Sequence, residues 1–463
     1  MEETERLRGV VKDCVHCGFC LPACPTYQLW AEEMDSPRGR IYLVNQILEG
    51  AEMTPAAAEH FDRCLGCMAC MTACPSGVQY DQLIEAARVW TEEARSEPAP
   101  ALPDVPGVPS IPGVPGVPAV LAGRAARLRE RAARAAIFSL FPYPRRLRAV
   151  TGPLKAAQRT GLDRRLARSS LPGRLSPVLG AALRLAPPPS AAGRAGASGA
   201  GRLPERVAAR GPRRAVVGML TGCVQSVFFP QVNAATARVL ATEGCDVIIP
   251  RGQGCCGALS LHAGREAEAV AFARQTIETF EQAGVDAIVV NSAGCGSAMK
   301  EYKRLLGGDG QDLGWAGRAA ALSARVRDFT EFLTELGPTA PRHPLPVTAA
   351  YHDACHLAHA QRITAAPRAL LRAIPGLDLV ELGDAGTCCG SAGVYNLLQP
   401  EAAAALGARK ADSVVASGAA LLISANPGCT LQISAALAQR GVPLRAAHTA
   451  EILDASINGV PLA

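Results

Sequence analysis

The sequence predicts an α+β multidomain protein, in which a helical, cysteine-rich N-terminal domain precedes two copies of one α/β module. Three observations predict this fold class. The 17 cysteines of the 463-residue chain form two blocks, eight in residues 14–74 and nine in residues 223–429. The first block consists of two runs with the same spacing, and the second repeats at nearly equal intervals. From residue 215 onward, short apolar runs alternate with Ala-rich amphipathic segments, which is typical of a parallel sheet covered by helices.

Length and composition favour a folded, metal-binding protein of the cytoplasm. A chain of 463 residues, 49% of them hydrophobic, has room for roughly two to four domains. Charge or proline interrupts the longest apolar stretches, and the charged N-terminus lacks the apolar core of a secretory signal. Since the cytosol keeps thiols reduced, so many cysteines indicate metal ligands rather than disulfides.

The first cysteine block contains two copies of the spacing C-x2-C-x2-C-x3-C-P, the ligand run of bacterial ferredoxins with two [4Fe–4S] clusters. In that arrangement three cysteines of a run hold one cluster, and the fourth holds the other. Zinc ribbons use cysteine pairs, so the spacing argues against zinc. We therefore expect the first cluster on Cys14, Cys17, Cys20 and Cys74, and the second on Cys64, Cys67, Cys70 and Cys24.

Residues 38–50, between the two runs, have a helical pattern (RGRIYLVNQILEG). This favours a helical ferredoxin-type 2[4Fe–4S] domain over residues 1–97, similar to the domain in the iron–sulfur subunits of succinate dehydrogenase and heterodisulfide reductase. His16 lies inside the first run, and we expect its side chain to be solvated or to donate a hydrogen bond near the cluster.

The segment between the cysteine blocks has two parts. Residues 98–120 carry proline at every third position from 103 to 118, which predicts a polyproline II spacer of ~50 Å or a tolerated insertion. Residues 121–214 contain 21 Arg and Lys against three acids, a net charge of +18 that leaves −12 for the rest of the chain. Helix-forming stretches and a Gly/Pro/Ala-rich run at 187–201 predict that this basic segment is part helix and part linker.

The positive charge of residues 121–214 has three explanations: attraction to anionic lipid, docking to an acidic subunit, or a solvated linker without a partner. The first would bring the protein to the inner face of the cell membrane. Nucleic acid is not an expected partner, because the segment has few aromatic residues and no known binding module.

The second cysteine block is an internal repeat. In both copies a single cysteine, a Cys-Cys-Gly triplet and a further cysteine follow one another, separated by 31 and 37 residues in the first copy and by 32 and 38 in the second. This duplication predicts two copies of one α/β module, at residues 215–340 and 341–463. The cysteines are Cys223, Cys255, Cys256 and Cys295 in the first copy, and Cys355, Cys388, Cys389 and Cys429 in the second.

Each group of these cysteines comes soon after a predicted strand. The strands are AVVGML, DVIIP and DAIVVN in the first module and VTAAY, LDLVEL and ALLISA in the second. Because the carboxyl ends of parallel strands meet at one edge of a sheet, four thiols gather there, enough to hold a metal or an iron–sulfur centre. Small buried cysteines beside tight turns are the alternative. Cys245 belongs to neither quartet, and we expect it to be a free packing thiol.

The repeat resembles the cysteine-rich CCG domain in the catalytic subunit of heterodisulfide reductase, where the last element is C-x2-C and five cysteines hold a non-cubane [4Fe–4S] cluster. The final position of that pair is Ala298 in the first copy here and Gln432 in the second. The resemblance therefore implies an additional iron–sulfur cluster only through the four cysteines that each copy retains.

A two-cluster ferredoxin domain followed by duplicated α/β CCG modules covers nearly the whole chain. This layout resembles the iron–sulfur subunit of glycolate oxidase, with the matching stretches LTGCVQSVFFPQVNAAT, QGCCGALSLHAG and YHDACHLAHAQ. The resemblance implies an electron-transfer subunit that passes electrons from an FAD-containing subunit, which oxidises glycolate to glyoxylate, towards a quinone or another acceptor. The chain itself has no flavin or nicotinamide motif, so the catalytic residues are expected on the partner.

Three alternatives remain open. The iron–sulfur subunits of anaerobic glycerol-3-phosphate dehydrogenase and of lactate utilisation have similar parts. A thiol–disulfide reductase like heterodisulfide reductase would need no flavoprotein, and a zinc-binding scaffold would have no redox role. His262, His352, Asp353, His356 and His359 lie beside the second-block cysteines, where they are expected to donate hydrogen bonds or carry protons, or to have a purely structural role.

Overall fold

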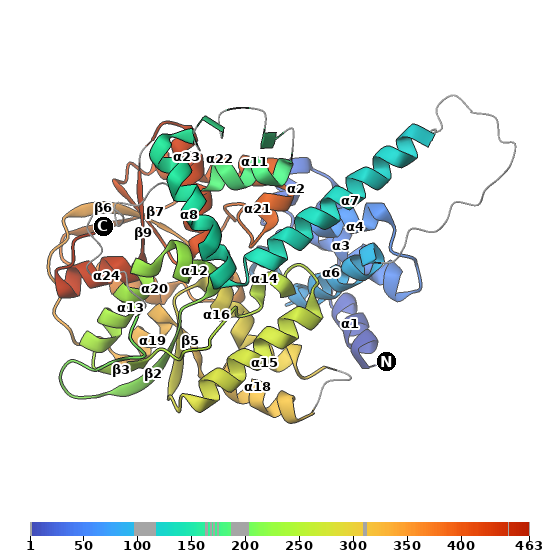
Figure 1. Cartoon of the computed structure of the whole chain (residues 1–463). Helices are drawn as coiled ribbons and strands as arrows, with labels where there is room; N and C mark the ends of the chain where they lie inside the picture. The colour runs from blue at the N-terminus through green and yellow to red at the C-terminus, as the bar shows by residue number, and fades with distance from the viewer. Residues whose placement is uncertain are drawn as a thin grey trace, which may run out of the picture.

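A computed structural model describes residues 2–96, 117–162, 165–166, 169, 172–173, 176–186, 203–308, 313–442 and 444–462 (Figure 1). Residues 98–116 of the expected polyproline spacer and the whole run at 187–201 lie outside these residues. Residues 117–120, the end of the expected spacer, are helical instead. The described part consists of an N-terminal helical domain, three linker helices and two α/β modules. No helix among the described residues has the length and apolar character needed to cross a membrane.

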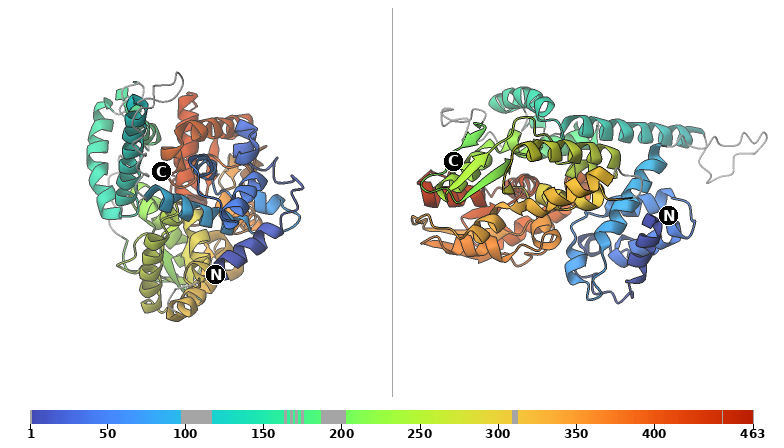
Figure 2. Two further views of the ribbon diagram at one scale, coloured as in Figure 1. Left: turned by 90° about the vertical axis from the view of Figure 1, so that its right-hand side faces the viewer. Right: turned by 90° about the horizontal axis from the view of Figure 1, so that it is seen from below.

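The N-terminal domain is a bundle of short helices at one end of the molecule, away from the strands of the two sheets (Figure 2). Proline opens three of the helices, and the hydroxyls of Ser36 and Thr54 cap the N-termini of two. The predicted helix at 38–50 is therefore confirmed as α3, and the domain is helical as expected. Its helices are α1 (Glu2–Lys12), α2 (Pro25–Trp30), α3 (Pro37–Leu48), α4 (Pro55–Arg63), α5 (Ala69–Ala73) and α6 (Tyr80–Ser96).

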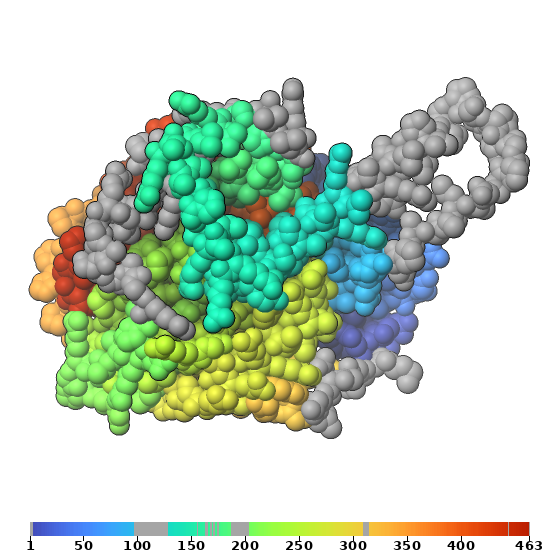
Figure 3. Space-filling view, viewed as in Figure 1, coloured from blue at the N-terminus to red at the C-terminus, as the bar shows by residue number. Residues whose placement is uncertain are grey.

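The basic segment forms the linker helices α7 (Val117–Leu140), α8 (Pro144–Thr160) and α11 (Pro177–Leu185). These helices lie on the surface of the molecule, across the two modules (Figure 3). Apolar residues fix them there: Phe138 packs in one buried cluster with Val394 and Leu397 of the second module. Arg134 pairs with Glu92 of α6 at 2.8 Å, so α7 also holds the N-terminal domain.

The first module is a sheet in the order β1-β3-β2-β4-β5, with all neighbours parallel except the antiparallel edge strand β1. Its strands are β1 (Arg206–Val207), β2 (Ala215–Leu220), β3 (Cys245–Ile248), β4 (Ala287–Val290) and β5 (Val326–Asp328). The helices around it are α12 (Cys223–Phe228), α13 (Pro230–Thr242), α14 (Ala258–Leu261), α15 (Glu266–Gln282), α16 (Ala293–Lys300), α17 (Tyr302–Leu305), α18 (Leu313–Arg325) and α19 (Phe329–Leu336).

The second module repeats this design in a parallel sheet with the order β7-β6-β8-β9. Its strands are β6 (Val347–His352), β7 (Leu377–Glu381), β8 (Leu421–Ser424) and β9 (Arg445–His448). Its helices are α20 (Ala365–Arg372), α21 (Tyr395–Leu398), α22 (Pro400–Ala416), α23 (Pro427–Gln439) and α24 (Thr449–Asn458), with a π-helical turn η3 at His356–Ala360.

The strand order shows that the two modules are duplicates. β3-β2-β4-β5 corresponds to β7-β6-β8-β9, and all six strands predicted from apolar runs are present. The strands β1, β5 and β9 are not predicted from apolar runs, because they are short strands at the sheet edges. One apolar core, from Val217 to Ile457, runs through both modules, so they form a single folded unit. Arg238 and Asp454, 2.6 Å apart, pair across the junction.

Candidate iron–sulfur centres

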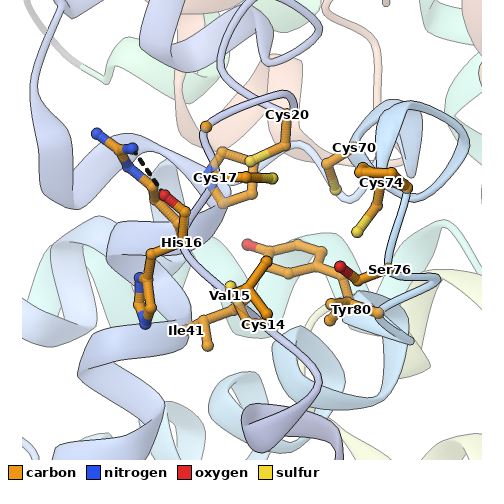
Figure 4. A pocket seen from close by; sticks show the side chains of 15 residues that line it. Cys14, Val15, His16, Cys17, Cys20, Ile41, Cys70, Cys74, Ser76 and Tyr80 are labelled. Atoms are coloured by element: carbon orange, nitrogen blue, oxygen red, sulfur yellow. Dashed lines mark hydrogen bonds between the residues drawn. The ribbon is translucent and has the colours of Figure 1, made fainter.

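The two cysteine runs of the N-terminal domain line two neighbouring cavities. Figure 4 shows the first cavity, around which Cys14, Cys17, Cys20 and Cys74 gather together with Cys70. Cys17 is exposed to solvent, and the other three members of the expected quartet are half-buried.

The second cavity is lined by Cys24, Cys64, Cys67 and Cys70, all of them buried. Pro37 and Tyr80 line both cavities and lie between them. The structure therefore brings together the thiols that the ferredoxin spacing groups, with the fourth cysteine of each run crossing to the other group.

Both runs fold into the same turn. Two positions after its first cysteine, and again two further on, each run has a positive φ: His16 and Gly18 in the first run, Gly66 and Met68 in the second. This backbone conformation wraps three thiols around one space and turns amides inward, as the N–H of Gly66 donates to Cys64 Sγ at 3.4 Å. The His16 side chain is exposed, and its carbonyl accepts a hydrogen bond from Arg38.

Buried positive charge surrounds the second cavity. Arg40 is fully buried and donates to Asp35 Oδ1 at 3.2 Å and to the His60 carbonyl at 2.7 Å, while Arg88 donates to the Cys64 carbonyl at 2.6 Å. Burial opposes ionisation of Cys64, but these two guanidiniums, together with hydrogen bonds from Gly66 and Tyr80, outweigh it and lower the pKa of that thiol. The site is thus prepared for negative charge on sulfur.

The other cysteines of the second quartet behave differently. Burial and neighbouring thiols raise the pKa of Cys67 and of Cys70 well above the usual value. Thiols crowded in this way ionise together only when a cation binds among them, because the metal supplies the missing positive charge. The donor set therefore fits an iron–sulfur cluster.

The first-module cysteines gather at the carboxyl edge of the sheet. Cys223 starts α12 after β2, Cys255 and Cys256 follow β3, and Cys295 lies in α16 after β4. Cys223 Sγ and Cys255 Sγ are 3.6 Å apart, and Cys256 lies close enough to both Cys255 and Cys295 to affect the pKa values of their thiols. The four thiols thus form a continuous chain, as the strand pattern predicts.

The second module repeats this chain of thiols. Each neighbouring pair of thiols, Cys355 with Cys388, Cys388 with Cys389 and Cys389 with Cys429, is close enough for one thiol to affect the pKa of the other. All four are buried, and the neighbouring thiols together with burial raise the pKa values of Cys355, Cys388 and Cys389 well above the usual value. The Nδ or Nε atom of His352 lies within 4.8 Å of the sulfurs of Cys389 and Cys429.

The glycine of each Cys-Cys-Gly triplet is required by its conformation. Gly257 has φ +83° and Gly390 has φ +88°. A Cβ atom at Gly390 would lie 2.8 Å from the Ala403 carbonyl oxygen, and one at Gly257 would lie 3.1 Å from the Ala269 carbonyl oxygen. The glycine amide also donates to the first sulfur of the pair, at 3.4 Å in both modules.

The predicted histidines fall into two groups. His262 and His356 face each other across the junction of the modules with their Nε2 atoms 3.1 Å apart, and His359 Nδ1 bonds Thr72 at 2.8 Å in the N-terminal domain. Burial lowers the pKa of His262 and of His356 to about 3, so both rings are neutral. Burial and the nearby Lys410 ammonium likewise lower the pKa of His352 to about 3.

The N-terminal domain meets the second module at its cysteines. Cys67, Cys355 and Cys388 share one buried cluster, and burial together with the Cys355 thiol raises the pKa of Cys67. Tyr395 fixes this contact with a hydrogen bond to the Arg63 carbonyl at 3.2 Å. Sequence reasoning missed this proximity, because the residues are separated by nearly 300 positions.

Comparison with known proteins follows the same division of the chain. A family profile described as a 4Fe-4S dicluster domain matches residues 10–78, and one described as a cysteine-rich domain matches residues 217–300 and 349–434. The chain is 34% identical to the probable glycolate oxidase iron–sulfur subunit of Bacillus subtilis, over 98% of this chain and 95% of that protein. The chain belongs to the family of glycolate oxidase iron–sulfur subunits.

Two further comparisons support this family. The chain is 33% identical to the glycolate oxidase iron–sulfur subunit of Escherichia coli, over 92% of this chain and 91% of that protein. A profile described as the linker region of this subunit matches residues 129–186, which contain most of the linker helices. Lactate utilization protein A of an Exiguobacterium species is 34% identical but covers only 52% of this chain. The protein is thus an iron–sulfur electron-transfer component of an oxidoreductase.

Proposed function

We propose that this chain is the iron–sulfur subunit of a glycolate oxidase (glycolate dehydrogenase) complex of the cytoplasm. In this proposal an FAD-containing partner oxidises glycolate to glyoxylate, and this chain passes the electrons towards a quinone or another acceptor. Iron–sulfur clusters carry single electrons, whereas a flavin can take a hydride and release its electrons singly. The observation that supports this role best is a continuous series of thiols from exposed Cys17 to buried Cys355.

The two cavities and the two groups of neighbouring thiols support the ligand sets that we propose. We assign one [4Fe–4S] cluster to Cys14, Cys17, Cys20 and Cys74, and a second to Cys64, Cys67, Cys70 and Cys24. The four cysteines of each module are assigned to an additional centre. Catalysis of glycolate oxidation is assigned to the partner. The division of the chain into the five segments expected from the sequence is part of the same proposal.

The order of the centres follows from exposure. Cys17 is the exposed member of its quartet, and the side chains of Val15 and Phe19 beside it are 69% and 67% exposed. Apolar side chains around an exposed ligand suit a docking surface for a redox partner. We assign the flavoprotein to this face, while Cys67 leads inward to the second module.

Purification from the native host under anaerobic conditions tests this function. The expected result is a co-purifying flavoprotein, with glycolate reducing the clusters of the complex, as followed by EPR, and lactate or glycerol 3-phosphate reducing them far more slowly. Reduction by one of those substrates instead would reassign the complex. Disulfide turnover by the isolated chain without a flavoprotein would establish the thiol–disulfide reductase, and stoichiometric zinc without iron would establish the scaffold.

A membrane contact is a second part of the proposal, and it rests on α8. Arg145, Arg148 and Arg159 are exposed and recur at helical spacing on one face of this helix. Each arginine near an anionic surface contributes about 1 kcal/mol. We expect flotation with vesicles containing phosphatidylserine, and roughly 100-fold weaker binding when all three are changed to Gln. Equal flotation of the variant and the original chain would disprove this contact.

A further inference from the structure

We propose that His352 is a nitrogen ligand of the metal centre in the second module, so that this centre differs in kind from the one in the first module. The inference rests on the proposed function, which assigns metal centres to the module cysteines. In related domains the C-x2-C element supplies a fifth cysteine to the centre, and in this module Gln432 stands at that position.

The position of His352 is that of a ligand. The residue ends β6, three positions before Cys355, and its side chain is 1% exposed. One ring nitrogen and the sulfurs of Cys389 and Cys429 all lie within 4.8 Å of one another. Imidazole nitrogen and thiolate sulfur are the donors that zinc and iron–sulfur centres accept together.

His352 also lacks any other use for its nitrogens. Among the residues that the structure describes, neither its Nδ1 nor its Nε2 has a hydrogen-bond partner. A buried ring without partners costs free energy unless something else binds it. By contrast, His448, which is equally buried, uses both nitrogens: Nε2 donates to the Asn291 carbonyl at 2.8 Å, and Nδ1 accepts from the Ala450 amide at 3.0 Å.

Gln432, which stands at the position of the missing cysteine, is not available as a ligand. Its Nε2 donates to the Ala403 carbonyl at 2.8 Å, and its Oε1 accepts from Asn396 at 3.1 Å. Both ends of the amide are therefore occupied. The ligand beside Cys389 and Cys429 is thus supplied by His352, at the end of β6, rather than by Gln432.

Among the described residues of the first module, 215–308 and 313–340, this arrangement has no counterpart. Leu220, three positions before Cys223, occupies the place of His352 and is likewise buried. The modules also differ in charge: fully buried Lys410, in α22, pairs with Asp384 at 2.9 Å and lies close enough to His352 to affect its ring. The helices α15 and α22 can be aligned on the glycine of each triplet, because Ala269 contacts Gly257 in the same way that Ala403 contacts Gly390. In this alignment the position of Lys410 corresponds to the neutral Thr276 of α15.

The exchange of a thiolate for an imidazole has a chemical consequence. With a neutral imidazole as ligand, the centre carries one negative charge fewer than it would with a fifth thiolate. Histidine ligation raises the reduction potential of iron–sulfur centres. The second module would then hold its electron at a higher potential than an all-cysteine centre. It is also the module whose cysteines lie beside Cys67, so electrons would move towards it.

The test uses the full chain, purified anaerobically, with histidine labelled with 14N or 15N. Pulsed EPR of the reduced protein is expected to show a strongly coupled nitrogen that changes with the isotope and is lost in His352→Leu, the residue found in the first module. If the centre contains zinc, absorption spectroscopy at the zinc edge is expected to lose one nitrogen neighbour in the same variant. His356→Leu, beside Cys355, is the matched control and is expected to retain the signal.

A second variant keeps the test informative if His352→Leu fails to fold. His352→Cys supplies a thiolate, so it should retain the metal, lose the nitrogen coupling and show a lower midpoint potential. A metal-loaded second module without nitrogen coupling, or coupling lost in His356→Leu instead, would overturn the assignment of His352 alone. If Cys388→Ser leaves iron and zinc content unchanged, the module holds no metal, and that part of the proposed function fails instead.

Discussion

Individual buried charges set the electrostatics of the N-terminal centres. Arg40 lines the second cavity, and Arg88 donates to the carbonyl of Cys64, which lines it too. Asp35 accepts hydrogen bonds from Arg40 and, at 3.0 Å, from Arg63. A charge buried in this way is tolerated only with its partners in place. No spacing or periodicity in the sequence indicates that these residues converge, since they lie on four different elements.

Replacing Arg40 should change both stability and potential. Arg40→Gln leaves Asp35 and the Cys64 region short of one positive charge, so we expect a loss of about 3 kcal/mol in unfolding free energy. We also expect a lower midpoint potential of the second cluster, because reduction adds negative charge there. Potentiometric EPR and chemical denaturation would measure these changes. Arg40→Lys keeps the charge, and an equal potential shift in both variants would contradict this explanation.

His448 should contribute to the pH dependence of stability. Its burial lowers its pKa to about 4, whereas in the unfolded chain the value is about 6.5. Between these values the unfolded state binds more protons, so stability falls as pH falls below about 6.5. Between pH 8 and pH 5 the unfolding free energy of each protein falls. We expect this fall to be roughly 2 kcal/mol smaller in His448→Asn than in the original chain.

Denaturant unfolding of the original chain and the variant at the two pH values would measure this difference. Asn can still cap α24, so the helix should survive the substitution. If both proteins lose the same stability between pH 8 and pH 5, His448 is not the group responsible.

At the scale of elements, the Cys-Cys-Gly turns decide whether four thiols meet. The strand runs and the repeat predict that each turn lies at the edge of a sheet, and the structure agrees. The close approach of α22 to Gly390 follows only from how that helix packs. Sequence patterns locate helices and strands well, but they do not state which helix face touches which turn.

Gly390→Ala should damage the second module specifically. The added methyl group would meet the Ala403 carbonyl at 2.8 Å at a φ of +88°, so the turn must shift and move Cys388 and Cys389. Gly418→Ala is the matched control: it has a similar φ of +66° but open space around its Cβ. We expect a clear loss of metal in the first variant and about 1 kcal/mol of strain without metal loss in the second. Metal analysis and denaturation would measure both, and equal metal loss would contradict the steric argument.

At the scale of the whole molecule, packing joins parts that the sequence presents as separate. The basic linker helices cover the modules rather than stand apart from them, and the two modules share one core. The docking face around Cys17 is the place where this unit is expected to meet its partner. Exposed apolar side chains there are not explained by the fold itself.

Charge on this face should slow electron entry. For the double variant Val15→Glu/Phe19→Glu we expect about tenfold slower reduction of the clusters by the flavoprotein with glycolate, or ~1.4 kcal/mol, with unchanged iron content. Stopped-flow absorption would measure the rate. Leu128→Glu, on α7, changes a side chain that is 70% exposed and should alter the rate less than twofold. A similar effect of both variants would remove the docking face from the proposal.

Local spacing and the periodicity of strands and helices are enough to predict the ferredoxin runs, the duplicated α/β module and the grouping of cysteines in quartets. Three further features appear only in the folded chain: the charges that converge on Cys64, the contact of Cys67 with the second module, and the unpartnered His352 facing Cys389 and Cys429. These features arise where separate elements pack together. Packing depends on the shape and burial of surfaces that are distant along the chain, and no local pattern encodes it.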